Sequence, residues 1–182
     1  MSRHLSWRPS QLPPRMTTCF QGVATGLLEG AAGVFNEEDA QRRVEVNFWR
    51  TLALLPRHVR QTLRRYWKSD AVPERYVGPE MPPLPIVFVG TPEKGLIPPN
   101  VLGCTDGFEF TFWLPLASIA PNSVLQTLVA HELAHAFLRV HGQESESENL
   151  EERAVRAVTL AWGFREEDLD VWCNRNERRM SP

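Results

Sequence analysis

The chain has 182 residues, of which 42% are hydrophobic and 23% charged, with a formal net charge of -2. These values are ordinary for a soluble globular protein of about one domain, and they give no general attraction to nucleic acid or to an anionic membrane. The three cysteines are too far apart for a disulfide framework or a paired-cysteine zinc module. No apolar run reaches the roughly 20 residues of a membrane-spanning helix, so we expect a cytoplasmic protein with no membrane segment.

The sequence changes character near residue 36. Residues 1–35 are rich in proline, glycine, serine and threonine and have no sustained hydrophobic period, so we expect an irregular N-terminal arm. The remainder, 36–182, is expected to form a single domain. Within it, residues 36–68 are predicted to be helical, and residues 84–164 carry the strands and motifs described below.

Two helices are predicted at the start of the domain. Asn36 is a good N-cap followed by three acidic residues, and apolar residues then recur at helical spacing as far as about Leu55. Pro56 lies where a first-turn proline belongs, and a second helix should follow it and end near Lys68.

A basic stretch, "RHVRQTLRRYWK", occupies residues 57–68. Its basic residues recur at three- to four-residue spacing with no acid among them, and two aromatic residues lie beside them. These residues are Arg57, Arg60, Arg64, Arg65, Lys68, Tyr66 and Trp67. Such a run is more often a solvated helix face than a phosphate-binding surface. Nucleic acid is therefore kept only as an alternative partner.

Two strands are predicted after a proline-rich connection. The run "LPIVFVG", residues 84–90, is rich in β-branched residues and closed by glycine, which indicates a buried strand. The run "FEFTFW", residues 108–113, alternates strictly, with Phe108, Phe110 and Phe112 on one face, so we expect it to be half exposed. Helices combined with a short mixed or antiparallel sheet give an α+β fold.

The segment "TLVAHELAHAFL", residues 127–138, carries the pattern His-Glu-x-x-His on a predicted helix. Residues four apart on a helix lie one above the other, so His131 and His135 can share one metal ion while Glu132 reaches a water beside it. The histidines fall on an apolar side of the helix, where buried polar groups need a partner. The pattern therefore predicts a zinc site with Glu132 as general base.

This motif and the strand before it resemble the zincin metallopeptidases over about residues 84–164. In that family the strand preceding the active helix pairs with an extended peptide through its edge. The resemblance implies a small zincin-like domain, with an edge strand packed against the His-Glu-x-x-His helix and a Zn2+ cofactor. It also implies a peptide or protein substrate, bound here by Phe110, Thr111 and Phe112.

The metzincin branch of the family continues the motif, through a glycine, to a third histidine. His141 stands at that last spacing, but Leu138 stands where the glycine should be. Leucine favours continuation of the helix, which would turn His141 away from His135. Gly142 is better placed as the residue that ends the helix, so we prefer another third ligand.

Gluzincins instead take a glutamate from a following helix, and "LEERAVRAVTLAWGF", residues 150–164, is predicted to be a helix closed by Gly163. In projection Glu151 lies within the apolar arc of this helix, whereas Glu152 falls on the far side. The run from Glu151 to Ala154 also resembles the gluzincin Glu-x-x-Ala element. Glu151 is the predicted third ligand, with Glu152 as the alternative if the helix is rotated. The weaker candidates are Glu144, Glu146 and Glu148.

We therefore predict a zinc-dependent metallopeptidase that resembles the small bacterial SprT-like and minigluzincin kinds. Two features of the family are missing. The family usually stabilises the oxyanion with a downstream tyrosine or histidine, but no tyrosine follows Tyr76, and His141 is the one downstream histidine. Val155 stands four residues after Glu151, where thermolysin-like members place an aspartate that holds a histidine. A non-catalytic zinc-binding scaffold, or a nucleic-acid-associated protein that uses the basic helix, is the alternative.

Overall fold

The computed structural model describes residues 35–69, 71–78, 84–91, 95, 97, 101–143 and 147–180. The predicted N-terminal arm, apart from Phe35, lies outside these ranges. In chain order the described elements are α1 (Glu37–Leu54), α2 (Arg57–Tyr66), the short 3-10 helix η2 (Glu74–Tyr76), β1 (Ile86–Gly90), β2 (Gly103–Thr105), β3 (Glu109–Trp113), α3 (Leu114–Ile119), α4 (Asn122–Val140), α5 (Glu148–Ala161) and α6 (Glu166–Met180).

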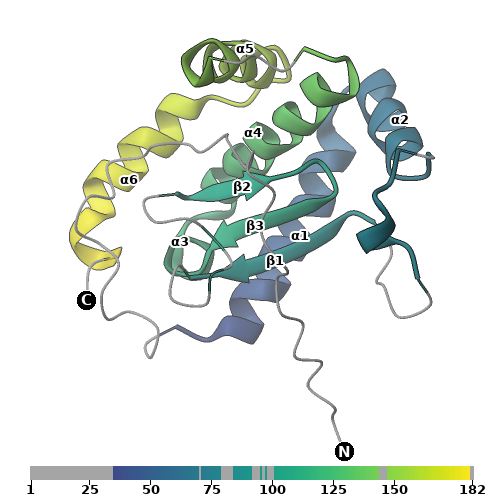
Figure 1. The fold of residues 1–182 in the computed structure, drawn as a ribbon. Helices are drawn as coiled ribbons and strands as arrows, with labels where there is room; N and C mark the ends of the chain where they lie inside the picture. The colour runs from purple at the N-terminus through teal and green to yellow at the C-terminus, as the bar shows by residue number, and fades with distance from the viewer. Residues whose placement is uncertain are drawn as a thin grey trace, which may run out of the picture.

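The three strands form a mixed sheet in the order β1-β3-β2, with β1 parallel and β2 antiparallel to β3. Helices α1 and α4 run along one face of this sheet (Figure 1). Helix α4 is also the common neighbour of α1, α2, α5 and α6. The predicted α+β fold with a short mixed sheet is confirmed, and α4 is the element around which the other helices are arranged.

Both helices predicted for residues 36–68 are present. The side-chain oxygen of Asn36 accepts hydrogen bonds from the backbone N–H groups of Glu38 and Asp39 at 3.1 and 3.3 Å, which caps α1 as expected. Helix α1 ends at Leu54, and α2 starts directly after Pro56. The predicted strand at 84–90 is also confirmed as β1.

One side chain covers the outer edge of β1. The amide of Gln41 on α1 donates to the carbonyl of Val87 at 2.7 Å and accepts from the N–H of Val89 at 2.9 Å. It therefore bonds to β1 as a neighbouring strand would. Exposed strand edges are templates for further pairing, and Gln41 blocks that pairing at the centre of β1.

The expectation of a half-exposed edge strand at residues 108–113 is wrong. β3 is the middle strand of the sheet, and Phe110, Thr111 and Phe112 each pair with a residue of β1 and a residue of β2. These three side chains are at most 1% exposed, and Trp113 is buried as well. Because both faces and both edges of β3 are covered, its residues cannot pair with a substrate as predicted.

Besides the short η2 in the proline-rich connection, three elements were not predicted. β2 lies in a turn-rich stretch and takes the edge position expected for β3. Pro115 ends β3 as expected, but it lies in the first turn of a short helix, α3. Helix α6 follows Gly163 after a short connection. Across the described ranges, no helix combines the length and apolarity needed to cross a bilayer.

The guanidinium of Arg43 on α1 binds the C-terminal end of α3. It donates to the carbonyl oxygens of Ala117 at 2.9 Å, Ala120 at 2.5 Å and Ser118. Carbonyls at a helix C-terminus have no partner within the helix, and a cation is favourable there. Arg43 therefore joins α1 to the turn between α3 and α4.

We expect Arg43→Ala to lower the free energy of unfolding by about 2 kcal/mol, because hydrogen bonds from a charged group are worth roughly 1.5–3 kcal/mol. Urea unfolding followed by circular dichroism measures this change. The matched control is Arg42→Ala at the exposed neighbouring position, which should stay within about 0.5 kcal/mol of the wild type. Equal losses in the two variants would contradict the role given to Arg43.

Candidate metal centre

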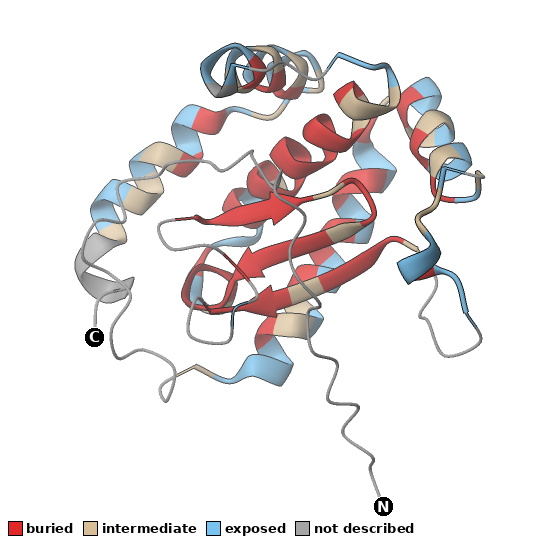
Figure 2. Cartoon of the chain, in the orientation of Figure 1, coloured by how far each residue is buried: buried red, intermediate tan, exposed pale blue. Residues whose placement is uncertain are grey.

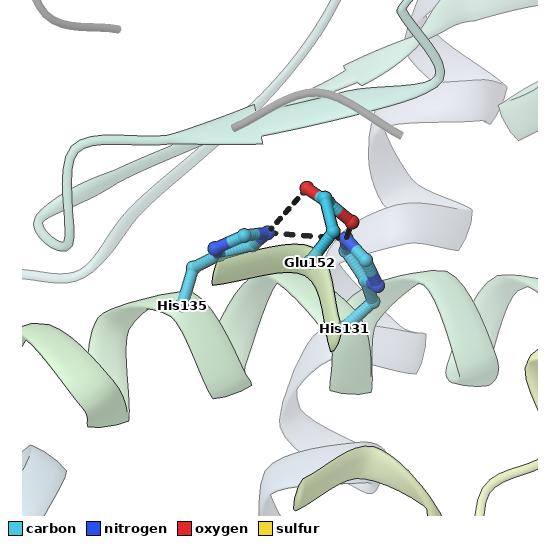
Figure 3. A group of neighbouring side chains, drawn as sticks. All are labelled: His131, His135 and Glu152. Atoms are coloured by element: carbon cyan, nitrogen blue, oxygen red, sulfur yellow. Dashed lines mark hydrogen bonds and ion pairs between the residues drawn. The ribbon is translucent and has the colours of Figure 1, made fainter. Parts of the chain in front are cut away.

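Three donor groups from two helices meet on one side of α4. The Nε2 atoms of His131 and His135 are 3.1 Å apart. Glu152 on α5 faces both, with Oε2 at 3.5 Å from His131 Nε2 and Oε1 at 3.4 Å from His135 Nε2 (Figure 3). Donor atoms around a tetrahedral zinc ion, with bonds of about 2.0–2.2 Å, lie about 3.4 Å apart. These three residues can therefore hold one metal ion.

The two histidines lie in the interior. Helix α4 is buried along most of its length (Figure 2), and His131 and His135 are 0% and 3% exposed. The Glu152 side chain, at 19% exposed, is the most accessible of the three. Two imidazole nitrogens this close cannot both present lone pairs to each other without a proton or a cation between them. A proton or a metal ion shared by the two nitrogens would satisfy both of them.

Each histidine also meets a carboxylate at its other ring nitrogen. The Nδ1 atom of His131 is 2.9 Å from Oε1 of Glu166 on α6, and the Nδ1 atom of His135 is 3.2 Å from Oε1 of Glu151 on α5. When Nδ1–H donates to a carboxylate, the lone pair of Nε2 is left for a metal. Both imidazoles are therefore held in the orientation that a metal site needs.

The preference for Glu151 over Glu152 as third ligand is corrected by this geometry. Glu151 lies at the Nδ1 side of His135, and the alternative, Glu152, lies at the Nε2 side. Helix α5 is rotated relative to the predicted projection, since Leu150, Ala157 and Ala161, which the apolar arc placed on the inner side, are exposed. Glu151 is buried, as the apolar arc suggested, but its partner is a histidine N–H group.

His141 lies away from the centre. Leu138 continues α4 and is buried against α5. The helix ends at Val140, and Gly142, whose φ is +64°, is the glycine that follows its C-terminus. His141 is exposed and packs on the ring of Phe137, with ring centroids 4.6 Å apart. This agrees with the expectation that it is not a ligand. Two of the weaker candidates, Glu144 and Glu146, lie outside the described residues.

Glu132 is fully buried beside the two histidines. Within the described chain neither of its carboxylate oxygens has a hydrogen-bond partner. Burial raises the pKa of the Glu132 carboxyl to about 7, against the opposing effect of His131 and His135. A buried carboxyl without a partner is costly to maintain, and such groups cluster at functional sites.

The carboxylates also set the charge of His135. Burial lowers the pKa of this imidazole, but hydrogen bonds to Glu151 and Glu152 outweigh burial and raise the pKa to about 9. For Glu152, burial raises the pKa, while the hydrogen bond from His135 and nearby positive charges bring it below its usual value. Without a metal, the His135–Glu152 pair therefore holds a proton. The negative charge around this pair suits a metal cation in place of the proton.

Sequence reasoning missed Glu166. One signal was present, because Glu166, Glu167 and Asp168 follow the glycine that closes α5 and are typical of the first turn of a new helix. That signal predicts a helix start. Which of the three carboxylates reaches back to His131 depends on the angle between α5 and α6, and the sequence does not contain that angle.

Comparison with protein families, with curated proteins and with solved structures gives no match for this chain. The interpretation of the site accordingly depends on the motif and on the geometry of the residues around it.

We expect Glu152→Ala to abolish the binding of one zinc ion per chain, because it removes a donor that faces both Nε2 atoms. Glu151→Ala should still bind one zinc ion at saturating zinc, with roughly 10- to 100-fold weaker affinity, because Glu151 contacts only the far nitrogen of His135. Calorimetric zinc titration of both variants measures stoichiometry and affinity together. Loss of stoichiometry in Glu151→Ala alone would show that the two roles are reversed.

Proposed function

We propose that this protein is a zinc-dependent metallopeptidase in which His131, His135 and Glu152 bind the metal and Glu132 is the general base. One observation carries the proposal: a buried carboxylate that has no hydrogen-bond partner among the described residues lies beside three converging metal donors. A purely structural zinc site prefers four protein ligands and has no use for such a carboxylate. Three ligands and an adjacent base are typical of hydrolytic zinc sites.

Two imidazoles and a carboxylate suit zinc well among the divalent metals. Zinc held there would supply a Lewis acid that polarises the peptide carbonyl and makes water more acidic. Glu132 then accepts a proton from the attacking water and delivers it to the leaving nitrogen of the peptide. A carboxyl whose pKa is near 7 in the metal-free protein can both accept and return a proton close to neutral pH.

We assign the substrate to the edge of β2 in place of β3. The N–H of Trp113 donates to the carbonyl of Leu102, and the N–H of Asp106 donates to the carbonyl of Glu109. Hydrogen-bonded and non-hydrogen-bonded residue pairs alternate along an antiparallel ladder. The N–H and C=O groups of Gly103 and Thr105 therefore point away from β3.

Gly103 of β2 lies directly against the proposed general base. A Cβ atom added to Gly103 would lie 2.8 Å from Oε1 of Glu132, so the strand and the carboxylate are in close contact. The other outer edge of the sheet, on β1, is bonded to Gln41. An extended peptide that adds to β2 as a strand would therefore lie next to the strand that contacts Glu132.

A zinc-binding protein without peptidase activity is the second candidate, and one observation favours it. Both tyrosines of the chain have other roles: Tyr66 stacks on Phe108, with centroids 4.6 Å apart, and Tyr76 donates to Asp106 at 2.6 Å. Neither is therefore assigned as the oxyanion donor that gluzincins usually supply from a tyrosine or histidine.

Nucleic acid is the weaker proposal for a partner. Trp67 is buried and donates to the carbonyl of Gly107 at 2.8 Å, and Tyr66 packs on Phe108, so both aromatic residues of the basic stretch are used in packing. What supports the proposal is a set of exposed cations along α2 and just after it: Arg57, Arg64, Arg65 and Lys68.

We expect Glu132→Gln to bind zinc as the wild type does but to hydrolyse peptides at least 100-fold more slowly, since a general base contributes roughly 10²- to 10⁴-fold. His135→Ala should lose both zinc and activity. A library of quenched fluorescent peptides and elemental analysis give the two readouts. Hydrolysis that survives in Glu132→Gln would overturn the mechanism. Zinc-loaded wild type that cleaves no peptide would favour the non-catalytic candidate.

We expect Gly103→Ala to reduce hydrolysis by at least tenfold with an unchanged zinc content. The new methyl group would lie 2.8 Å from Oε1 of Glu132, and the end of a flexible side chain yields before the backbone does. Misplacing a catalytic group by about 1 Å can cost as much as 100-fold in rate. Unchanged hydrolysis in Gly103→Ala would mean that the position of Glu132 does not matter for the reaction.

A further inference from the structure

Glu166 is a buried carboxylate with an ionisable partner on each side. It lies in the first turn of α6 and is 6% exposed. Its Oε1 atom is 2.9 Å from Nδ1 of His131 on α4, and its Oε2 atom is 3.2 Å from Nε of Arg156 on α5. One side chain of α6 therefore connects the helix that carries the histidines to the helix that carries Glu152.

We propose that Glu166 is the positioning residue for His131, that Arg156 holds Glu166 in place, and that the strength of metal binding therefore depends on the docking of α6. This inference rests on the metal site of the proposed function and does not depend on peptidase activity. Glu166 touches neither metal nor substrate in this scheme. It acts by orienting the His131 ring.

Helix α5 does not offer His131 a hydrogen-bond acceptor one turn after Glu152. The residue there is Arg156, whose guanidinium has only donors and so cannot accept a hydrogen bond from an imidazole N–H. It can bind a carboxylate that does so, and Glu166 is that carboxylate. Each histidine then has its own glutamate: Glu151 from α5 serves His135, and Glu166 from α6 serves His131.

The orientation of the two imidazole rings matters for metal binding. Their Nε2 atoms are 3.1 Å apart, and both must face the metal position. A ring turned over would present a carbon atom or a protonated nitrogen to the metal. The hydrogen bond from Nδ1–H of His131 to Glu166 keeps the proton on Nδ1 and the ring in the binding orientation.

The two contacts of Glu166 differ in solvent exposure, and this difference predicts which contact matters more for metal binding. His131 is 0% exposed, so its bond to Glu166 is shielded from solvent. The Arg156 side chain is 54% exposed and borders a cavity of about 170 Å³ that Leu160, Phe164 and Asp170 also line. Solvent screens an exposed ion pair and can replace it. Removal of Arg156 should therefore weaken metal binding less than removal of Glu166 does.

Zinc affinity and zinc release in the full-length chain test this inference, measured by competition with a chromophoric chelator. Glu166→Ala should bind zinc roughly 10- to 100-fold more weakly than wild type, and Glu166→Gln should fall between the two because its amide oxygen still accepts a hydrogen bond. Arg156→Gln should cost roughly two- to fivefold. The matched control is Glu167→Gln, at the exposed neighbouring residue in the same first turn, and it should change affinity less than twofold.

Nuclear magnetic resonance separates a positioning role from a general loss of stability. In the zinc-loaded wild type the Nδ1–H protons of both histidines should resonate downfield, as expected for protons bonded to carboxylates. In Glu166→Gln, which keeps the shape of the side chain, the His131 signal should move upfield. The His135 signal should stay in place because Glu151 is intact, and it serves as the internal reference.

Different results overturn the two proposals. If wild type binds zinc and both Glu166 variants release it as slowly as Glu167→Gln, the inference about Glu166 is wrong and the metal site stands. If wild type binds no zinc under any condition, the proposed function itself fails.

Discussion

Helix α4 carries two imidazoles and a carboxylate into the interior of the protein, and the surrounding helices satisfy the requirements of the two imidazoles. His131, Glu132 and His135 are all at most 3% exposed. Polar groups at that depth are costly unless they are paired. Glutamates on α5 and α6 supply the pairing for the histidines, so these two helices are attached to α4 by polar contacts as well as by apolar packing. Among these three residues, Glu132 has a carboxylate to which the described part of the chain gives no hydrogen-bond partner.

Much of this arrangement follows from local patterns. The cap at Asn36, the proline after α1, the β-branched run of β1 and the glycine that closes α4 were each predicted from a few neighbouring residues. The spacing of His131 and His135 is equally local, since four residues on one helix determine it. Features encoded within one helical turn or one short strand can be predicted well from the sequence.

Features that depend on the relation between elements were less predictable. The alternation in residues 108–113 describes one apolar face, but it carries no information on which strand is central, and β3 is paired on both sides. The rotation of α5 was taken from its apolar arc, yet Leu150, Ala157 and Ala161 of that arc are exposed, and the glutamates face α4. Polar contacts with α4 decided that rotation, and no projection of a single helix includes a neighbour's histidines.

The residues of the metal centre come from three helices that follow one another in the chain, between His131 and Glu166. The contacts between sheet and helices, in contrast, join residues far apart, as when Gln41 bonds to Val87 and Val89. Contacts close in sequence form faster, because less chain entropy is lost in closing short loops. A metal ion bound by these residues would join α4 to α5 through a short stretch of chain, so that ion would stabilise the C-terminal half of the protein during folding as well as in the folded state.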